Sequence, residues 1–520
     1  MKSLRAAIIA ALFLLLPLSA IADDVTLISR DGAIELSGTL MGFDGEFYRI
    51  DTEYGVLTVD GSGVICDGPG CPGLGPYVAH ITLSGAREMG QVLLPSLIEG
   101  FALRNGFALS REEEEGRKIV YTLYDGAESN RKAAVITLLL TNSSEGFADL
   151  IGNAADIVMS LREASAQERA MAREIGLGDI ADHRLVRVLA HDALVPVISP
   201  GNPVRRLSLR QLAEVFSGRI TNWAELGGED APITSYLLDE GAGFSELFTS
   251  SVVDGQGVRL SRDVERRRTN EALVEAVVAD PFGLGVSLYS QTGNAGIVTL
   301  SGDCGFEVRA APESVKAEDY PLSAPMYLYL PALRLPKIGR DFLDYLRSDA
   351  AQIVIRRVGL VDQMPGLIGL QSQGVRLVNA IRAAGDEIGL GELKRLADLM
   401  DRQTRLTVTF RFRGGSTALD APSQSNVALL AHALQAGRFD GHMLTFVGFS
   451  DGQGAAEQNR RLSLKRAQVV LEAVRAAAEL PMNAGQVTLR KEAFGEALPM
   501  ACDDSEWGRR VNRRVEVWLD

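Results

Sequence analysis

Apolar and polar residues alternate with period two from Val25 to about residue 64. The runs VTLISR, IELSGTL, FYRID and GVLTVD are separated by short turns that contain Asp-Gly, Asp-Gly-Glu or Glu-Tyr-Gly. Alternation bounded by glycine-containing turns is typical of half-buried strands joined by hairpins. The pattern predicts a small antiparallel sheet or barrel, and we assign it residues 23–75.

Strand patterns and helix patterns alternate between residues 76 and 365. The stretch VITLLLTNSSEGFADLIGNAADIVMS shows the repeating unit, in which an apolar strand, a Ser-rich turn and an amphipathic helix lead into a second strand. This order predicts an α/β domain built on mostly parallel strands.

A helical connector and a third domain complete the predicted organisation. Residues 366–402 show helical spacing in VRLVNAI and ELKRLADLM, and residues 403–520 read strand, helix, strand, helix and final strand. The second pattern predicts an α+β sandwich with its helices on one face of the sheet. The chain is therefore multidomain, which agrees with its length of 520 residues.

The first 22 residues have the pattern of a secretory signal. Lys2 and Arg5 precede an apolar run from Ala6 to Leu18, and Ala20-Ile21-Ala22 is a small-residue cleavage pattern. The alternative is an uncleaved anchor, although the run is short for a membrane span and no later stretch approaches the ~20 apolar residues that spanning needs. We expect residues 1–22 to be removed on export.

The net charge limits the classes of partner. The chain carries 53 basic and 67 acidic residues, a net charge of −14, and loss of Lys2 and Arg5 with the signal would make it −16. Phosphates of nucleic acids and anionic lipid headgroups would repel such a protein. Neither is expected as a partner.

Four cysteines are present in a chain that we expect to be exported. Cys66 and Cys71 stand in VICDGPGCPG, close enough in a Gly/Pro turn to form a disulfide. Cys304 and Cys502 belong to different predicted domains and either bridge them or remain free thiols. The scattered His and Cys residues have no metal-ligand spacing, and no cofactor is predicted.

Asp451 and Arg466 are the most informative pair in the sequence. Asp451 follows the apolar strand LTFVGF, and Arg466 lies fifteen residues later in a predicted helix. A carboxylate and a guanidinium at one end of a sheet can hold the ammonium and the carboxylate of a small zwitterion, and the guanidinium fork suits a carboxylate better than an ammonium would. The alternative is a turn-capping Asp and a solvated Arg.

The residues around this pair resemble the OmpA-like peptidoglycan-binding family. The matching positions of its motif are Asp451, Asn459, Leu462, Ser463, Arg466 and Ala467, and of its closing motif Asn512, Arg513, Arg514, Val515 and Glu516. The resemblance implies a diaminopimelate ligand, with its ammonium on Asp451 and its carboxylate on Arg466. It implies further contacts from Ser450, Asn459, Leu462 and Arg514. The family commonly has His or Thr near Phe449 and Ser450, so the affinity could differ here.

The central region resembles the phosphate-binding-protein family of periplasmic solute receptors. Leu194 to Gly228 carries the family's Val-rich strand, Asn-Pro turn and closing motif, with Phe216, Ser217, Gly218, Ile220, Asn222 and Trp223 in place. The resemblance implies two lobes that close on an anion held by helix N-termini. The anion-binding positions that it implies are Ser84, Gly85, Ala86, Arg87, Ser143, Ser144, Ser160, Arg162, Glu240, Gly241, Ala242 and Gly243. Each of these serines could instead be an ordinary N-cap.

One segment departs from the receptor family. Where the family has Arg-x-x-Gly-Ser-Gly-Thr, this chain reads Leu238-Asp239-Glu240-Gly241-Ala242-Gly243-Phe244. A desolvated phosphate needs nearly every oxygen paired, so three lost contacts should cost several kcal/mol. We hypothesise that the anion ligand is altered, weak or absent.

Gly448 to Gly452 spell G-x-S-x-G, the motif of a hydrolase nucleophile elbow around Ser450. His432 and His442 are the histidines of this region, but both precede the serine, which is not the order of that family. We therefore expect a periplasmic, non-enzymatic protein that is bound to peptidoglycan and associated with the outer membrane of a Gram-negative bacterium. Its central domain is either an anion receptor that serves a transporter or a scaffold for protein contacts.

Overall fold

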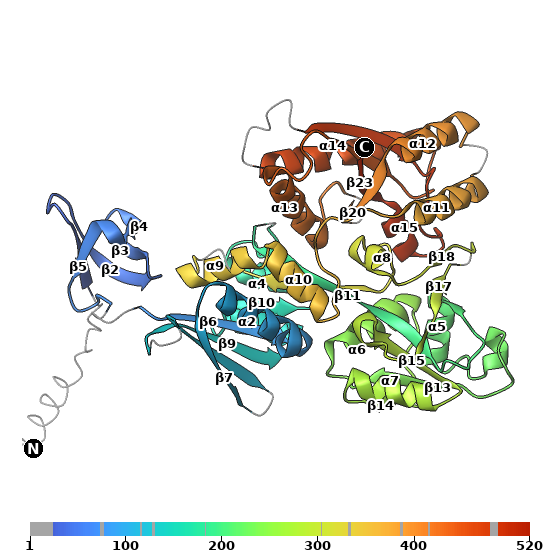
Figure 1. The fold of residues 1–520 in the computed structure, drawn as a ribbon, viewed down its shortest axis with the longest axis horizontal. Helices are drawn as coiled ribbons and strands as arrows, with labels where there is room; N and C mark the ends of the chain where they lie inside the picture. The colour runs from blue at the N-terminus through green and yellow to red at the C-terminus, as the bar shows by residue number, and fades with distance from the viewer. Residues whose placement is uncertain are drawn as a thin grey trace, which may run out of the picture.

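The computed structural model describes residues 24–72, 77–114, 117–126, 130–182, 184–302, 304–330, 334–384, 388–413, 416–478 and 487–520. The predicted signal, residues 1–22, lies outside the described residues. A small β domain, a large two-lobed domain and a C-terminal α+β domain follow one another along the chain (Figure 1). Within the described residues, no helix is both long and apolar enough to cross a membrane.

The N-terminal domain is an antiparallel sheet with the strand order β4-β3-β2-β1-β5. The strands are β1 (Asp24–Ser29), β2 (Glu35–Phe43), β3 (Phe47–Thr52), β4 (Gly55–Asp60) and β5 (Val64–Asp67). Val25, Leu27 and Ile50 are its buried core, and a disulfide joins Cys66 to Cys71. The predicted antiparallel sheet and the predicted disulfide are both confirmed.

The β domain docks on the large domain through charged residues. The Asp44 carboxylate accepts hydrogen bonds from Arg334 Nε at 2.6 Å and from Arg340 Nη1 at 3.0 Å. The Arg334 guanidinium also lies 4.2 Å from the centre of the Phe47 ring. These contacts place the β domain beside α9 (Lys337–Tyr345) in Figure 1.

One long curled sheet runs through both lobes of the central domain, with the order β14-β13-β15-β11-β19-β10-β6-β9-β8-β7 and β16 beside β11. The strands of the first lobe are β6 (Ala79–Ala86), β7 (Ala108–Glu114), β8 (Lys118–Tyr124), β9 (Lys132–Thr141), β10 (Ile157–Ser160) and β19 (Ser323–Tyr329). Its helices are α2 (Leu94–Arg104), α3 (Ser143–Ile151), α4 (Ala166–Glu174), α9 and α10 (Asp349–Arg357).

The second lobe has smaller elements. They are β12 (Arg206–Ser208), β13 (Thr234–Leu238), β14 (Glu265–Arg267), β15 (Gly283–Leu288), β16 (Gly296–Ile297), β17 (Thr299–Ser301), β18 (Glu307–Val308), α5 (Leu209–Phe216), α6 (Gly243–Phe248) and α7 (Asn270–Ala279). The short helix α8 (Pro312–Lys316) leads back to the first lobe. Trp223, part of the receptor-like motif, is buried and donates from Nε1 to Phe282 O at 2.9 Å, so the motif supports the core of this lobe.

Strand β11 (Val186–Ile198) connects the two lobes. Its first part pairs with β19 and its last five residues with β15, in both cases antiparallel. The expectation of mostly parallel strands is therefore wrong. Pairing is parallel between β6 and its neighbours β9 and β10 and between β13 and its neighbours β14 and β15. Hairpins and the strands that join the lobes supply antiparallel pairs.

The C-terminal domain has a four-stranded sheet in the order β20-β23-β21-β22. Its elements are α11 (Leu370–Ala383), α12 (Leu390–Arg402), β20 (Thr404–Arg411), α13 (Ala421–Gln435), β21 (Met443–Phe449), α14 (Ala456–Ala477), β22 (Thr488–Gly495), α15 (Glu506–Asn512) and β23 (Arg514–Leu519). One core joins α13 and α14 to the sheet, and a second core joins Ala380 and Leu396 of α11 and α12 to Trp518.

The helices therefore cover both faces of this sheet, and the expectation of helices on one face is wrong. The helical spacing of residues 366–402 predicts a connector between domains. The structure instead makes α11 and α12 the second helical layer of the C-terminal domain, so that β21 and β23 are buried on both faces.

Candidate functional site

The loop after β21 lies at one end of the C-terminal sheet, beside helix α14. Gly448 allows β21 and α14 to approach each other, because a Cβ at this position would lie 2.1 Å from Ser463 O. The close approach brings Ser450 and Asp451, at the end of the strand, to the same region as Arg466 of α14. We call Ser450, Asp451, Arg466 and Arg513 the loop site.

Asp451 is paired with Arg513. The Asp451 carboxylate is buried and its Oδ2 accepts a hydrogen bond from Arg513 Nη1 at 2.7 Å. The other terminal nitrogen of Arg513 donates to Glu506 Oε1 at 2.7 Å. In the sequence, Arg513 belongs to the closing motif, which does not indicate that its side chain lies beside Asp451.

Arg466 is buried, and two of its three guanidinium nitrogens have no hydrogen-bond partner among the described residues. The residue is 3% exposed, and its guanidinium lies 5.1 Å from the centre of the Phe412 ring. Among the described residues, no group forms a hydrogen bond with its Nε or Nη1. Burial lowers the pKa of Arg466, Arg513 lowers it further, and Asp451 opposes both. A buried guanidinium in this state is costly unless an anion reaches it.

The neighbouring positions hold the loop in place. Ser450 Oγ is buried and has no hydrogen-bond partner in the part of the chain that the structure describes. Asn459 donates to Glu496 Oε2 at 2.6 Å, and Leu462 is 40% exposed on α14. Asp503 accepts a hydrogen bond from Gly452 N at 2.6 Å. The site thus combines one buried carboxylate, two guanidiniums and an unpartnered hydroxyl.

Arg514 does not lie in the loop site. It is fully buried, donates to Glu516 Oε1 at 2.7 Å and to Leu498 O at 2.9 Å, and stacks on the Phe449 ring. Period-two alternation in β23 turns Arg514 and Glu516 to the face that α11 covers. Arg513, one residue earlier, therefore replaces Arg514 among the candidate ligand contacts.

The histidines do not support a hydrolase at Ser450. His442 stands just before β21 and lies 3.2 Å from Asp520, whereas Ser450 follows the other end of that strand. His432 lies within α13. Across the described ranges, no group of three or more His, Cys, Asp and Glu residues could hold a metal ion.

The cleft between the lobes has a volume of about 1110 Å³. Of the positions implied for an anion, Arg87, Gly241 and Ala242 line this cleft, together with Glu88 and Asp192. Asp192 is buried and accepts hydrogen bonds from Ser290 Oγ at 2.5 Å and Ala193 N at 2.8 Å. Burial raises the pKa of Asp192 to about 6 against these hydrogen bonds.

The serines implied for anion binding have partners within the protein. Ser84 Oγ donates to Asp149 at 2.5 Å, and Ser160 Oγ donates to Arg162 O at 2.8 Å. Ser143 Oγ accepts from Leu161 N, and Ser144 Oγ accepts from Arg162.

The other implied positions are also accounted for by the fold. Arg162 is held by Glu168 at 2.7 and 2.9 Å. A Cβ at Gly85 would lie 2.0 Å from Met159 O, and Ala86 belongs to the core. Glu240 is exposed and lies 3.5 Å from Arg266. These residues have structural roles in the state described.

A carboxylate from the first lobe reaches the start of α6 in the second lobe. Glu88 Oε1 accepts a hydrogen bond from Gly243 N at 2.8 Å. Burial raises the pKa of Glu88, against the Gly243 hydrogen bond and the charge of Arg87. Gly243 is among the positions that the receptor resemblance implies, but Glu88 is not. The one sequence signal for Glu88 is its place directly after Ser84 to Arg87, the first predicted anion-binding turn.

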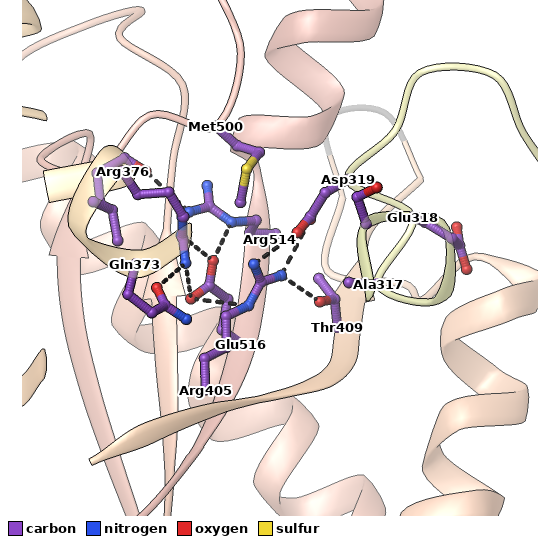
Figure 2. Close-up of polar contacts among 12 residues, drawn as sticks. Ala317, Glu318, Asp319, Gln373, Arg376, Arg405, Thr409, Met500, Arg514 and Glu516 are labelled. Atoms are coloured by element: carbon purple, nitrogen blue, oxygen red, sulfur yellow. Dashed lines mark hydrogen bonds and ion pairs between the residues drawn. The ribbon is translucent and has the colours of Figure 1, made fainter. Parts of the chain in front are cut away.

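A buried ionic cluster joins the C-terminal domain to the central domain (Figure 2). Asp319, just before β19, accepts from Arg405 at 2.7 and 3.1 Å. Glu516 accepts from Arg376 at 2.5 Å and from Arg514 at 2.7 Å. Burial by itself raises the pKa of Glu516, but the surrounding arginines outweigh burial and hold that pKa well below its usual range.

The C-terminal domain touches both lobes. In the first lobe, Val188 N donates to Ser425 Oγ at 3.1 Å, and Asp349 pairs with Arg438. In the second lobe, Cys304 forms a disulfide with Cys502. This disulfide resolves the alternative that the sequence left open, and it ties the loop region of the C-terminal domain to the second lobe.

Two family models match the chain. The model of the PBP superfamily domain matches residues 123–350, and that of the OmpA family matches residues 411–513. The phosphate-binding protein PstS of Bacillus subtilis (strain 168) is 26% identical over 174 residues, which are 33% of this chain and 54% of that protein. Protein SphX of Synechococcus elongatus is 23% identical over 247 residues, 45% of this chain and 71% of that protein. The matched region thus spans about half the length of the Bacillus protein.

Parts of the chain are also similar to solved structures. An ABC-type phosphate transport receptor from Vibrio cholerae aligns with a TM-score of 0.42 and 19% identity, covering 54% of this chain and 99% of that one. The periplasmic domain of Helicobacter pylori MotB aligns with a TM-score of 0.19 and 19% identity, covering 23% of this chain and 74% of that one. From the family matches, the chain carries a two-lobed PBP superfamily domain followed by a domain of the OmpA family.

Proposed function

We propose that this protein is exported to the periplasm and binds peptidoglycan through the loop site of its OmpA family domain. Residues 1–22 would direct export, and both families imply a location in the cell envelope. The expected setting is the wall and outer membrane of a Gram-negative bacterium. The protein would act by binding, without catalysis.

The observation that carries the proposal is the buried guanidinium of Arg466. Its Nε and Nη1 have no hydrogen-bond partner among the described residues, so a carboxylate from outside the chain would offset the cost of burying it. Diaminopimelate offers a carboxylate for Arg466 and an ammonium for Asp451. Arg513 occupies Oδ2 of Asp451, so an ammonium that approaches Oδ1 need not displace it.

Binding to purified sacculi and to diaminopimelate tests the proposal. Arg466→Met should lower affinity by about 10- to 100-fold, since a hydrogen bond to a charged group contributes about 1.5–3 kcal/mol. The same variant should unfold at an equal or higher temperature, because it removes an unpaired buried charge. Calorimetric titration and thermal unfolding measure the two effects.

Arg475→Ala is the matched control, because Arg475 is an exposed arginine of the same helix. It should leave pelleting with sacculi unchanged. Asp451→Ala should abolish pelleting as Arg466→Met does. If both variants at the loop site pelleted like wild type, the site assignment would be wrong.

For the central domain we propose a receptor fold that no longer takes phosphate and serves as a scaffold for protein contacts. Two observations support the scaffold over a transport receptor. Glu88 already places a carboxylate on Gly243 N, and the C-terminal domain is attached to both lobes. Lobe closure on a ligand would have to strain these attachments. Micromolar binding of phosphate by the wild-type protein would contradict this proposal.

A further inference from the structure

A groove of about 400 Å³ separates the second lobe from the C-terminal domain. Charged and aromatic residues line it from both sides, namely Arg210, Phe306 and Glu307 of the second lobe and Glu506, Trp507 and Arg509 of α15. Its volume lies in the range of small-molecule sites, roughly 300–1,000 Å³, which are frequent between domains. We call it the interdomain groove.

The two walls of the interdomain groove are held together covalently. The disulfide between Cys304 of the second lobe and Cys502 of the C-terminal domain joins them, and Cys502 is part of the groove lining. Gly302 permits the contact, because a Cβ at this position would lie 2.3 Å from Cys502 Sγ. The second lobe is therefore a fixed wall of the groove.

The interdomain groove adjoins the loop site. Glu506 lines the groove and accepts a hydrogen bond from Arg513, which in turn binds Asp451. Asp503 precedes the groove residue Asp504 and accepts from Gly452 N, next to Asp451. One short segment, residues 503–506, thus separates the two sites, and a ligand larger than one amino acid could reach both.

Trp507 sets the chemistry of the interdomain groove. It is half-buried, whereas the other two tryptophans of the chain, Trp223 and Trp518, are fully buried. An indole with one accessible face packs well against the C–H face of a sugar ring. The same groove is lined by the guanidiniums of Arg210 and Arg509, which can donate to hydroxyl and carboxylate oxygens, and by the Glu307 carboxylate, which can accept hydrogen bonds from hydroxyls.

We propose that the interdomain groove binds a sugar of the glycan strand while the loop site holds diaminopimelate of the attached peptide. The inference rests on the proposed function, and it extends wall recognition to a surface supplied partly by the second lobe. The ligand is then a sugar-bearing peptide of peptidoglycan, with one sugar ring on the Trp507 indole. The receptor domain becomes part of the wall-binding site.

Two ligands separate this inference from the diaminopimelate site. Titration of the full mature chain should give roughly three- to tenfold tighter binding for the disaccharide tetrapeptide than for the same tetrapeptide without sugars. Trp507→Ala should lose this difference. It should bind the disaccharide tetrapeptide and the sugar-free tetrapeptide equally, with the affinity that the wild-type protein has for the sugar-free one. The disaccharide peptide should also shield wild-type tryptophan fluorescence from acrylamide.

Arg210→Ala tests the wall that belongs to the second lobe, and Arg219→Ala is its control, because Arg219 is an exposed arginine of the same lobe outside the groove lining. Arg210→Ala should weaken binding of the disaccharide peptide, and Arg219→Ala should leave it unchanged. The inference would be overturned if wild type bound the two peptides with equal affinity. It would also be overturned if Trp507→Ala still bound the disaccharide peptide more tightly than the sugar-free one. Failure of wild type to bind either peptide would instead overturn the diaminopimelate site on which it rests.

Discussion

The carboxylate of Glu88, in the first lobe, accepts a hydrogen bond from the backbone N–H of Gly243, in the second lobe, at 2.8 Å. Gly243 begins α6, in the segment where this chain departs from the receptor family. The first lobe thus supplies a negative group to a backbone donor that the resemblance assigns to an anion. A bound phosphate would meet both the loss of this donor and the repulsion of a second negative charge.

Removing the Glu88 carboxylate should raise the affinity of the cleft for phosphate. In Glu88→Ala, Gly243 N is freed and a like charge is removed from the cleft. At an effective dielectric constant near 20, two charges about 4 Å apart interact by about 4 kcal/mol, so even a partly screened effect should raise phosphate affinity about tenfold or more. Isothermal titration of both proteins with inorganic phosphate measures this change.

Glu145→Ala provides the comparison, because Glu145 is an exposed carboxylate that lines the same cleft. Its substitution should change phosphate affinity less than that of Glu88, since it forms no contact with Gly243. Identical phosphate affinities for wild type and Glu88→Ala would contradict the role that we give to Glu88.

The stability of the central domain should depend on pH through Asp192. Burial raises the pKa of this carboxyl from 3.8 to about 6, so the folded state binds the proton more tightly than the unfolded state does. The stabilisation of the folded state that results from this proton binding is fully present below about pH 4 and is lost as the pH rises through about 6. The loss amounts to roughly 3 kcal/mol.

Asp192→Asn should remove this dependence, because an amide can keep the hydrogen bonds with Ser290 and Ala193 without titrating. Urea denaturation between pH 4 and pH 7 should show the unfolding free energy of the variant rising relative to wild type. Asp239→Asn replaces an exposed carboxylate of the same cleft. Its unfolding free energy should change with pH in the same way as that of wild type. If the unfolding free energies of Asp192→Asn and wild type differed by the same amount at every pH from 4 to 7, the prediction would be refuted.

The attachment of the C-terminal domain should depend on Asp319. This residue is buried and binds Arg405 and Arg411. Asp319→Ala leaves those guanidiniums without their carboxylate in the interface, and breaking a buried pair in this way costs about 3–5 kcal/mol. Calorimetry should show a lower transition temperature, and proteolysis should cut faster between the two domains.

Asp349→Ala is the matched case, because its ion pair with Arg438 also joins the two domains but its side chain is 62% exposed. Exposed pairs contribute less than about 1 kcal/mol. Equal effects of the two substitutions would show that the buried cluster is not what holds the interface.

Several features could be predicted from local sequence patterns. The hairpins of residues 24–67 and the bridge from Cys66 to Cys71 depend on neighbours within a few residues. Asp451 and Arg466 share a motif of sixteen residues, and the strand and helix that carry them were evident from the apolar pattern. The motif places Arg514 among the expected ligand contacts, whereas the structure buries Arg514 and brings Arg513 to Asp451. The alternation of β23 alone would have placed Arg514 on a covered face.

Local periodicity and short motifs were enough to predict the order of the domains and the resemblance of two of them to known families. The folded chain was needed to show that α11 and α12 cover the second face of the C-terminal sheet, that Asp451 binds Arg513, and that Glu88 contacts Gly243. It also joined Cys304 to Cys502 across 198 residues. These contacts link positions far apart in the chain, and their energies come from burial and charge pairing that no local pattern records.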